Sequence, residues 1–366
     1  MDKFNFKYLF FVICSVSIAS LKTYPEIFTH ISGRDSWICV SIASLIFIIY
    51  FDYIIRIYVN NKYKTLEDIF RIALGEFLGK FFLCLFAFML FLSLIVSASV
   101  ETNVIHTNLF IETPVWYILI FVVVPGLYTV MKGKNALMIV LILCIIGSTI
   151  NGINLYILTR PYKDYRLLFP VFEKGLDKDF IIGIVKSLGL YGSISITLPF
   201  LYLIEKNKKM RIVALVTNLF VAQMIIVAIV GIFATFTVER ANVIVYPKLI
   251  QTQLITYFGF IASGEFYVIY QVISALFAKY IATFFALLII LKELNVTKLF
   301  NPNYLPVCVS LVVYLIAYSL NNNLIELFRF LNYYAYISIV GFIIIPVIVF
   351  TMYNIRSKSK KEKIKQ

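Results

Sequence analysis

Three lysines stand inside long apolar stretches of this chain, where a charged side chain is costly. They are Lys22, Lys186 and Lys279. Two prolines, Pro25 and Pro199, interrupt stretches of the same kind, in "SLKTYPE" and "SITLPF". Because lipid cannot satisfy the backbone groups that a broken helix releases, such breaks persist where they line a cavity or a binding site. These residues therefore predict recognition of a small polar molecule in the middle of a membrane.

Composition places the residues in a polytopic membrane protein. The chain is 61% hydrophobic and 14% charged over 366 residues, whereas soluble domains have roughly 45–50% apolar and about 25% charged residues. Several apolar runs exceed the roughly 18 residues that indicate a membrane-spanning helix. We expect ten spans, at about 7–30, 35–57, 77–103, 114–131, 135–158, 180–204, 211–237, 263–291, 303–320 and 332–354.

The distribution of basic residues predicts the orientation. If both termini are cytoplasmic, the inner segments hold roughly two thirds of the 33 lysines and arginines, as the positive-inside rule expects. The net charge of +14 is then mainly a topology signal, and the chain has no water-soluble basic face for nucleic acid. The basic cytoplasmic tail, 355–366, is favourable for contact with anionic membrane lipid, and the alternative, which we favour, is a solvated flank that stops transfer. Between spans two and three, Thr65 and Asp68 have capping-box spacing before a short amphipathic helix.

The spans divide into two sets of five within a single transmembrane domain, 1–366. The first repeat covers about 7–158 and the second about 180–354, and the first span of each is the interrupted one. Because five is odd, the second repeat crosses the membrane in the opposite sense. Paired broken segments of this kind indicate a transporter-like binding site at the repeat interface, with helix N-termini suited to a carboxylate and freed carbonyls suited to an ammonium.

Several motifs occur in a characteristic order along nearly the whole chain. They are "SIASLKTYP", "GRDSWICV", "LFIETPVWYILIFVVVPGLYTVMKGKNALMI", "LLFPVFEKGL", "LFAKY" and "NYLPV". Together they resemble the endospore germination permease family, the B subunits of nutrient germinant receptors, within the amino acid–polyamine–organocation superfamily. The resemblance implies an all-α, leucine-transporter-like fold with helices 1 and 6 broken. It also implies an amino-acid-like ligand, the spore inner membrane as location, and a receptor A subunit and C lipoprotein subunit as partners.

The candidate ligand-binding residues lie on the two interrupted spans and on span eight. They are Ser20, Lys22, Thr23, Tyr24, Gly189, Tyr191, Gly192, Ser193, Ser195, Thr197 and Lys279. For Lys22 the alternative is a structural tether to freed carbonyls, and for the small residues it is close helix packing. The resemblance implies that the Lys279 ammonium replaces the cation that sodium-coupled relatives hold beside the first break.

The chain departs from the resembled family in both breaks. Ser17, Ala19 and Ser20 stand where glycines are common, and the "YGS" at 191–193 lacks a carboxylate often found there. Two further charged residues receive structural predictions. Lys186 would extend to the outer membrane surface, and Glu101 would form a salt bridge at the outer rim.

No enzyme is expected. His30 and His106 lie near span ends without metal-ligand spacing, and neither HExxH, GxSxG nor a phosphate-binding loop occurs. The five cysteines lack CxxC spacing and predict neither a disulfide nor a metal site, and no cofactor is implied. The leading hypothesis is a ligand-sensing receptor subunit. The alternatives are an autonomous proton-coupled amino acid permease and a structural scaffold with a vestigial site.

Overall fold

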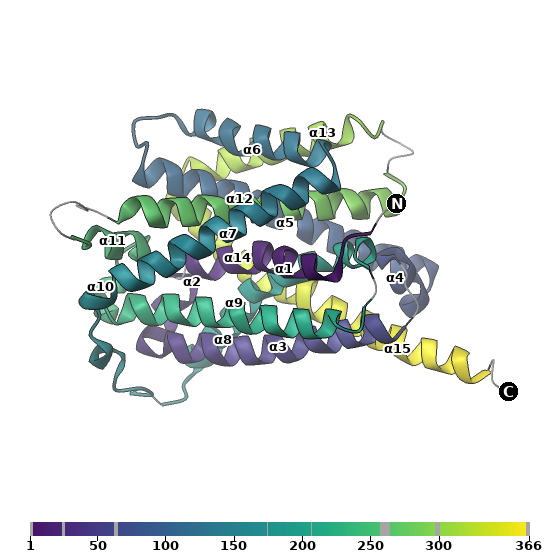
Figure 1. Ribbon diagram of the computed structural model, residues 1–366, viewed down its shortest axis with the longest axis horizontal. Helices are drawn as coiled ribbons and strands as arrows, with labels where there is room; N and C mark the ends of the chain where they lie inside the picture. The colour runs from purple at the N-terminus through teal and green to yellow at the C-terminus, as the bar shows by residue number, and fades with distance from the viewer. Residues whose placement is uncertain are drawn as a thin grey trace.

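The computed structural model describes residues 3–23, 26–61, 65–173, 175–205, 207–256, 264–296 and 301–363. For 20–23, 26 and 359–363 it describes the backbone alone. The regular elements in this part of the chain are helices that run mainly along the long axis of the bundle (Figure 1). Both termini lie at the same end, as an even number of spans requires, and α10 (Val238–Asn242) and α11 (Pro247–Gln253) lie at the opposite end.

The ten predicted spans are confirmed. The first five are α1 (Leu9–Thr23) with α2 (Glu26–Ser32), then α3 (Ser36–Asn60), α5 (Glu76–Asn108), α6 (Val115–Met131) and α7 (Lys134–Leu158). The last five are α8 (Lys178–Tyr191) with the 3-10 helix η5 (Gly192–Leu203), then α9 (Met210–Phe233), α12 (Glu265–Glu293), α13 (Leu305–Asn321), and α14 (Leu324–Ile339), which continues through the π-helix η7 (Val340–Ile344) into α15 (Ile345–Lys363). Seven described stretches are long and apolar enough to cross a membrane, and three further apolar helices are shorter.

The short helix α4 (Leu66–Leu74) follows α3 where the capping-box spacing predicts a helix. The Thr65 side chain accepts a hydrogen bond from the Asp68 backbone N–H at 3.2 Å, which satisfies one of the donors that a helix N-terminus leaves open. Ile69 and Phe70 are buried on one face of α4, which packs against α5 and α15. The apolar face of this amphipathic helix therefore packs against the bundle.

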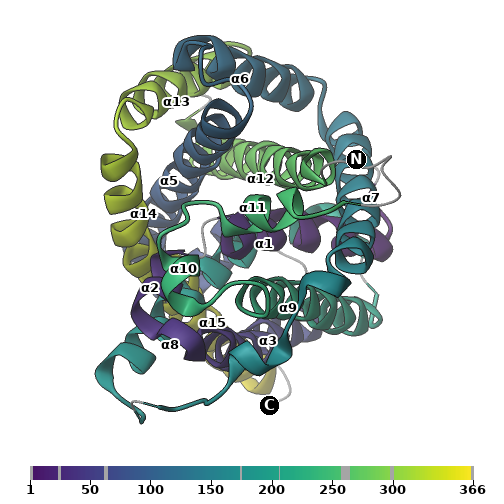
Figure 2. The ribbon, with the colours of Figure 1, turned by 90° about the vertical axis from the view of Figure 1, so that its left-hand side faces the viewer.

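Helix α1 is the central element. It is largely apolar, and Val12, Ile13, Cys14 and Val16 are fully buried, as expected for a helix surrounded by others. Figure 2 shows α1 in the middle of the bundle, between α12 and α9. It also packs against α7, α8 and η5. A movement of α1 would therefore alter its contacts with helices from both halves of the chain.

The interruption of the sixth span is a change of helix type. The α-helix α8 ends at Tyr191, and the following twelve residues form the 3-10 helix η5. Such runs are rarely longer than three or four residues. Pro199 lies within η5 and cannot donate a backbone hydrogen bond, and its ring would collide with the carbonyl four residues earlier in an α-helix. The predicted first interruption falls at Tyr24 and Pro25, which lie outside the described residues, between the end of α1 at Thr23 and the start of α2 at Glu26.

The two interrupted spans begin at opposite ends of the bundle. The segment that precedes α1 pairs with the end of η5, because the Phe4 N–H donates to the Leu203 carbonyl at 2.8 Å and the Glu205 N–H donates to the Phe4 carbonyl at 2.7 Å. The start of span one thus lies beside the end of span six. This is the relation expected for inverted repeats, whose residue boundaries stay a prediction.

Candidate functional site

The predicted glycines of span six are positions of close helix contact. A side chain at Gly189 would collide with the carbonyl oxygen of Ala335 in α14, and the Gly189 carbonyl accepts a hydrogen bond from the Ser338 hydroxyl at 2.7 Å. A Cβ at Gly192 would lie 3.2 Å from the Phe342 Cβ. Both glycines therefore allow α14 and η7 to lie against the sixth span.

The predicted hydroxyls of span six are buried and mostly bonded to protein. The Tyr191 hydroxyl pairs with the Ser44 hydroxyl of α3, and the Ser193 hydroxyl donates to the Val16 carbonyl of α1 at 2.9 Å. The latter bond joins the two interrupted spans directly. Thr197 is buried, and its hydroxyl has no hydrogen-bond partner among the described residues.

A second group of hydroxyls meets at the π-helix. The Tyr50 hydroxyl of α3 donates to the Phe342 carbonyl at 2.8 Å and lies 2.9 Å from the Ser195 hydroxyl. Ser195 also donates to the Phe342 carbonyl. Three spans are thus joined at one carbonyl of η7, which is consistent with the frequent occurrence of π-turns at functional positions.

The predicted residues of span one are less fully described. Ser20, Lys22 and Thr23 belong to the last turns of α1, and their side chains lie outside the described part of the structure, as does Tyr24 as a whole. Lys279 lies near the middle of α12 and is 1% exposed. Contact of these residues with a ligand stays a prediction.

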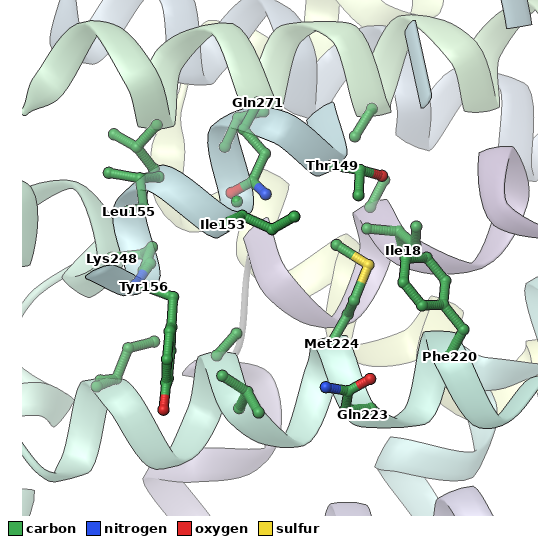
Figure 3. A pocket seen from close by; sticks show the side chains of 18 of the residues that line it. Ile18, Thr149, Ile153, Leu155, Tyr156, Phe220, Gln223, Met224, Lys248 and Gln271 are labelled. Carbon is green, nitrogen blue, oxygen red and sulfur yellow. The ribbon is translucent and has the colours of Figure 1, made fainter. Parts of the chain in front are cut away.

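A cavity of about 420 Å³ lies on the other side of α1, between α1, α7, α9 and α12 (Figure 3). Ile18 and Ala19 of α1 form one part of its wall, next to the first interruption. Phe220 and Met224 of α9 and Ile153 of α7 give it a largely apolar lining. Ligand pockets are commonly about 300–1,000 Å³, so the volume suits a small molecule.

Polar side chains enter this apolar cavity at defined places. Gln271 of α12 donates to the Ser148 carbonyl at 3.0 Å and points into the cavity (Figure 3). Gly152 makes room for it, since a Cβ there would lie 2.6 Å from the Gln271 Nε2. Lys163 and Lys248 also line the cavity, and Figure 3 shows Lys248 at the end formed by α11. Apolar walls with a few fixed polar groups are typical of small-molecule sites.

Lys279 continues the cavity-lining face of α12. Gln271, Ala275 and Lys279 follow one another at intervals of four residues, which places them on one helix face. Lys279 is therefore one turn beyond the cavity wall. None of the predicted ligand-binding residues whose side chains the structure describes lines the cavity itself, and the predicted positions nearest to it are Lys279 and the end of α1.

Sequence reasoning did not find most of the cavity wall. The prediction placed the site residues on spans one, six and eight, whereas the cavity is formed by spans one, five, seven and eight. The available signal was polar residues inside spans five, seven and eight, namely Thr149, Gln223 and Gln271. Hydroxyl and amide side chains also occur at ordinary helix contacts, so their presence alone did not indicate a cavity.

The prediction for Lys186 is wrong. This side chain is 5% exposed and does not extend to the surface. Its Nζ donates to the Asn332 Oδ1 at 2.6 Å and to the Ile27 carbonyl at 3.2 Å. Helices α2 and α14 pack over α8 and cover the lysine, so a polar partner inside the bundle replaces water.

The prediction for Glu101 is also wrong. Its side chain is 2% exposed, and its Oε2 has no hydrogen-bond partner within the described ranges. Helix α5 continues to Asn108, and α12 and α13 pack along it, so a residue near the predicted span end is still covered. The described residues include no group of three His, Cys, Asp or Glu side chains that could hold a metal ion.

Comparison with known proteins places this bundle in a family. The model of a family described as spore germination protein matches residues 3–325. The chain belongs to this spore germination protein family. A curated relative, spore germination protein XB of Bacillus anthracis, is 28% identical over 156 residues. That match spans 42% of this chain and 42% of the relative's length.

A solved structure agrees with the fold. The chain aligns with a Na⁺-coupled sialic acid symporter in a substrate-bound, outward-open state, with a TM-score of 0.63 over 96% of this chain and 89% of that one. The sequence identity is 9%, so the likeness concerns the fold alone. This member of the spore germination protein family is thus a multi-pass membrane protein with the predicted leucine-transporter-like fold.

Proposed function

We propose that this chain is the integral membrane subunit of a nutrient germinant receptor in the spore inner membrane, with both termini cytoplasmic. It binds a small, amino-acid-like germinant near mid-membrane and signals to an A subunit and a C lipoprotein subunit. The observation that carries the proposal is the cavity of about 420 Å³ beside the end of α1, in a chain of the spore germination protein family.

The proposed signal is a change in the packing of α1. This helix contacts both the cavity wall and, through the Val16 carbonyl, the Ser193 hydroxyl of η5. A ligand that fits the cavity better in one arrangement of α1 shifts the protein toward that arrangement, since only differential affinity moves such an equilibrium. The partner subunits would sense the resulting arrangement.

Two measurements on the full chain test the proposal. Spores that lack the chain should lose their germination response to one nutrient, and reintroduction of the chain should restore it. The purified protein in lipid nanodiscs should bind that nutrient saturably. A full nutrient response in spores without the chain, measured across a panel of amino acids and sugars by loss of optical density, would contradict the receptor role.

Glu101 favours a second candidate, an autonomous proton-coupled amino acid permease. A carboxyl group buried inside the bundle without a partner for its Oε2 in the described structure is a candidate proton carrier. The permease would take up radiolabelled amino acid into proteoliposomes under an imposed pH gradient. Glu101→Gln should then abolish the gradient dependence, whereas saturable binding without uptake rejects this candidate.

A further inference from the structure

Two lysines from separate connections reach the same end of the cavity. Lys163 lies in the connection after α7, and Lys248 lies in α11. The Lys163 Nζ is 4.6 Å from the centre of the Tyr156 ring, and the side chain is half-buried. Burial lowers the pKa of the Lys163 ammonium, because the charged form loses solvation.

The fold holds these lysines in place. The Asp164 N–H donates to the Ala234 carbonyl at 2.6 Å, which fixes the Lys163 connection against the end of α9. Gly231 of α9 provides the space for Lys163, since a Cβ there would be 3.4 Å from the lysine Cε. The Gln251 side chain then joins the two parts: it donates to the Gly231 carbonyl at 2.7 Å and accepts from the Lys248 Nζ at 2.6 Å.

The carboxylate nearest in sequence is already used elsewhere. Asp164 forms a salt bridge of 2.9 Å with Arg166. In the part of the chain that the structure describes, Lys163 makes a cation–π contact with the Tyr156 ring and forms no salt bridge with a carboxylate. A half-buried ammonium of this kind favours an anion that enters from the cavity.

We propose that the cavity recognises a small carboxylic acid with an apolar side chain, whose carboxylate lies against Lys163 and Lys248 and whose apolar part faces Met224 and Ile18. This inference rests on the proposed function and adds the chemical class of the ligand. Figure 3 shows Lys248 at one end of the cavity and Ile18, Phe220 and Met224 toward the other. Lys163 lies near Lys248, because it faces Gly231, whose carbonyl is bonded to the same Gln251 side chain that Lys248 contacts. The arrangement therefore selects for a ligand with one anionic end and one apolar end.

The test compares amino acids with their amides, in which an uncharged carboxamide replaces the carboxylate. The full chain is placed in phosphatidylcholine nanodiscs, and binding of L-alanine, L-valine, L-leucine and L-phenylalanine is measured beside binding of the corresponding amides. We expect at least one acid to bind saturably and its amide to bind more weakly. Removal of one charged partner should weaken acid binding by roughly tenfold or more in Lys163→Met and in Lys248→Met, with little change for the amide.

Two matched variants separate charge from structure. Lys163→Arg should retain acid binding. Lys132→Met should have no effect, although Lys132 also lies over a tyrosine ring, with its Nζ 5.2 Å from the centre of Tyr128, because it does not line the cavity. Acid affinity should also fall as the pH rises and Lys163 loses its proton, and Lys163→Arg should remove this dependence. The titratable neighbours Tyr156, Lys248 and Asp164 are unchanged in that comparison.

Three outcomes would overturn the inference. Equal affinity for acids and amides would do so while leaving the receptor role intact. Loss of acid binding when anionic phosphatidylglycerol is added would show that the lysines hold a lipid headgroup. Absence of saturable binding of all four acids would reject the ligand class, and the germination assay of the preceding section would then decide the receptor role independently.

Discussion

Two regions lie on opposite sides of α1, and both are polar places in an apolar bundle. On the η5 side, Tyr191, Ser193 and Ser195 are buried and bonded to protein groups of α1, α3 and η7. On the α9 side, the bundle is hollow, and polar side chains enter an apolar cavity. The comparison shows that an interrupted helix does not by itself create space, because neighbouring helices pack against η5 and the Ser338 hydroxyl of α14 bonds the Gly189 carbonyl just before the change of helix type.

Each region has a different expected response to substitution. The bonded region should contribute to stability, since its groups already have partners and their loss leaves buried atoms unsatisfied. The cavity on the α9 side should contribute to ligand affinity, since its lining residues would contact the ligand. The following changes separate these two roles.

The largest effect is expected for Lys279→Gln in α12. Lys279 continues the cavity-lining face of Gln271 and Ala275 and is 1% exposed. Its charge should be required for the ligand response, so the substitution should abolish nutrient-induced germination while the protein still inserts into the membrane. Germination curves and immunoblots of spore membranes measure the two effects. An unchanged dose–response curve would remove Lys279 from the site.

A smaller loss is expected when the cavity is filled. Ala228→Phe in α9 places an aromatic ring in the hollow, which should weaken ligand binding by more than about tenfold, or about 1.4 kcal/mol. Val216→Phe on the same helix is the control, because Val216 is 54% exposed and does not line the cavity. Titration of both variants in nanodiscs measures the difference. Equal affinities would show that the cavity is not the ligand site.

The smallest effect is expected for Tyr50→Phe in the bonded region. The substitution removes hydrogen bonds to the Phe342 carbonyl and to Ser195, and it should lower the free energy of unfolding by about 1 kcal/mol with little change in ligand affinity. Tyr53→Phe, which removes an exposed bond of 2.9 Å to Thr351, should have less effect. Thermal unfolding in detergent, with and without ligand, checks both variants. A lost response with unchanged stability would place the ligand site on the η5 side.

Much of the fold could be predicted from local patterns. Long apolar runs indicated the ten spans, and Pro199 marked a place where an α-helix cannot continue, which the structure realises as the 3-10 helix η5. Thr65 and Asp68 predicted the start of α4. In each case the cause is local: lipid requires an apolar stretch of given length, proline lacks an N–H, and a hydroxyl three residues before an N–H can cap it.

The candidate site was predictable only in part. The residues of span six were found, and the structure shows that Gly189 and Gly192 serve close helix contacts. The wall formed by α7 and α9 was missed because no residue type distinguishes a side chain that faces a cavity from one that faces a packed helix. Lys186 and Glu101 were misplaced for the same reason: distance along a span does not show which neighbouring helices cover a position.

Hydropathy and helix-breaking residues were thus sufficient for the class of protein, the number of spans and the place where span six changes its helix type. These properties depend on the chain and its solvent alone. The hollow beside α1, the meeting of Lys163 with Lys248, and the burial of Glu101 emerged only from the packed bundle. Each of these requires helices distant in the sequence to lie side by side, and it is this packing that decides which polar side chains face a cavity and which face a partner.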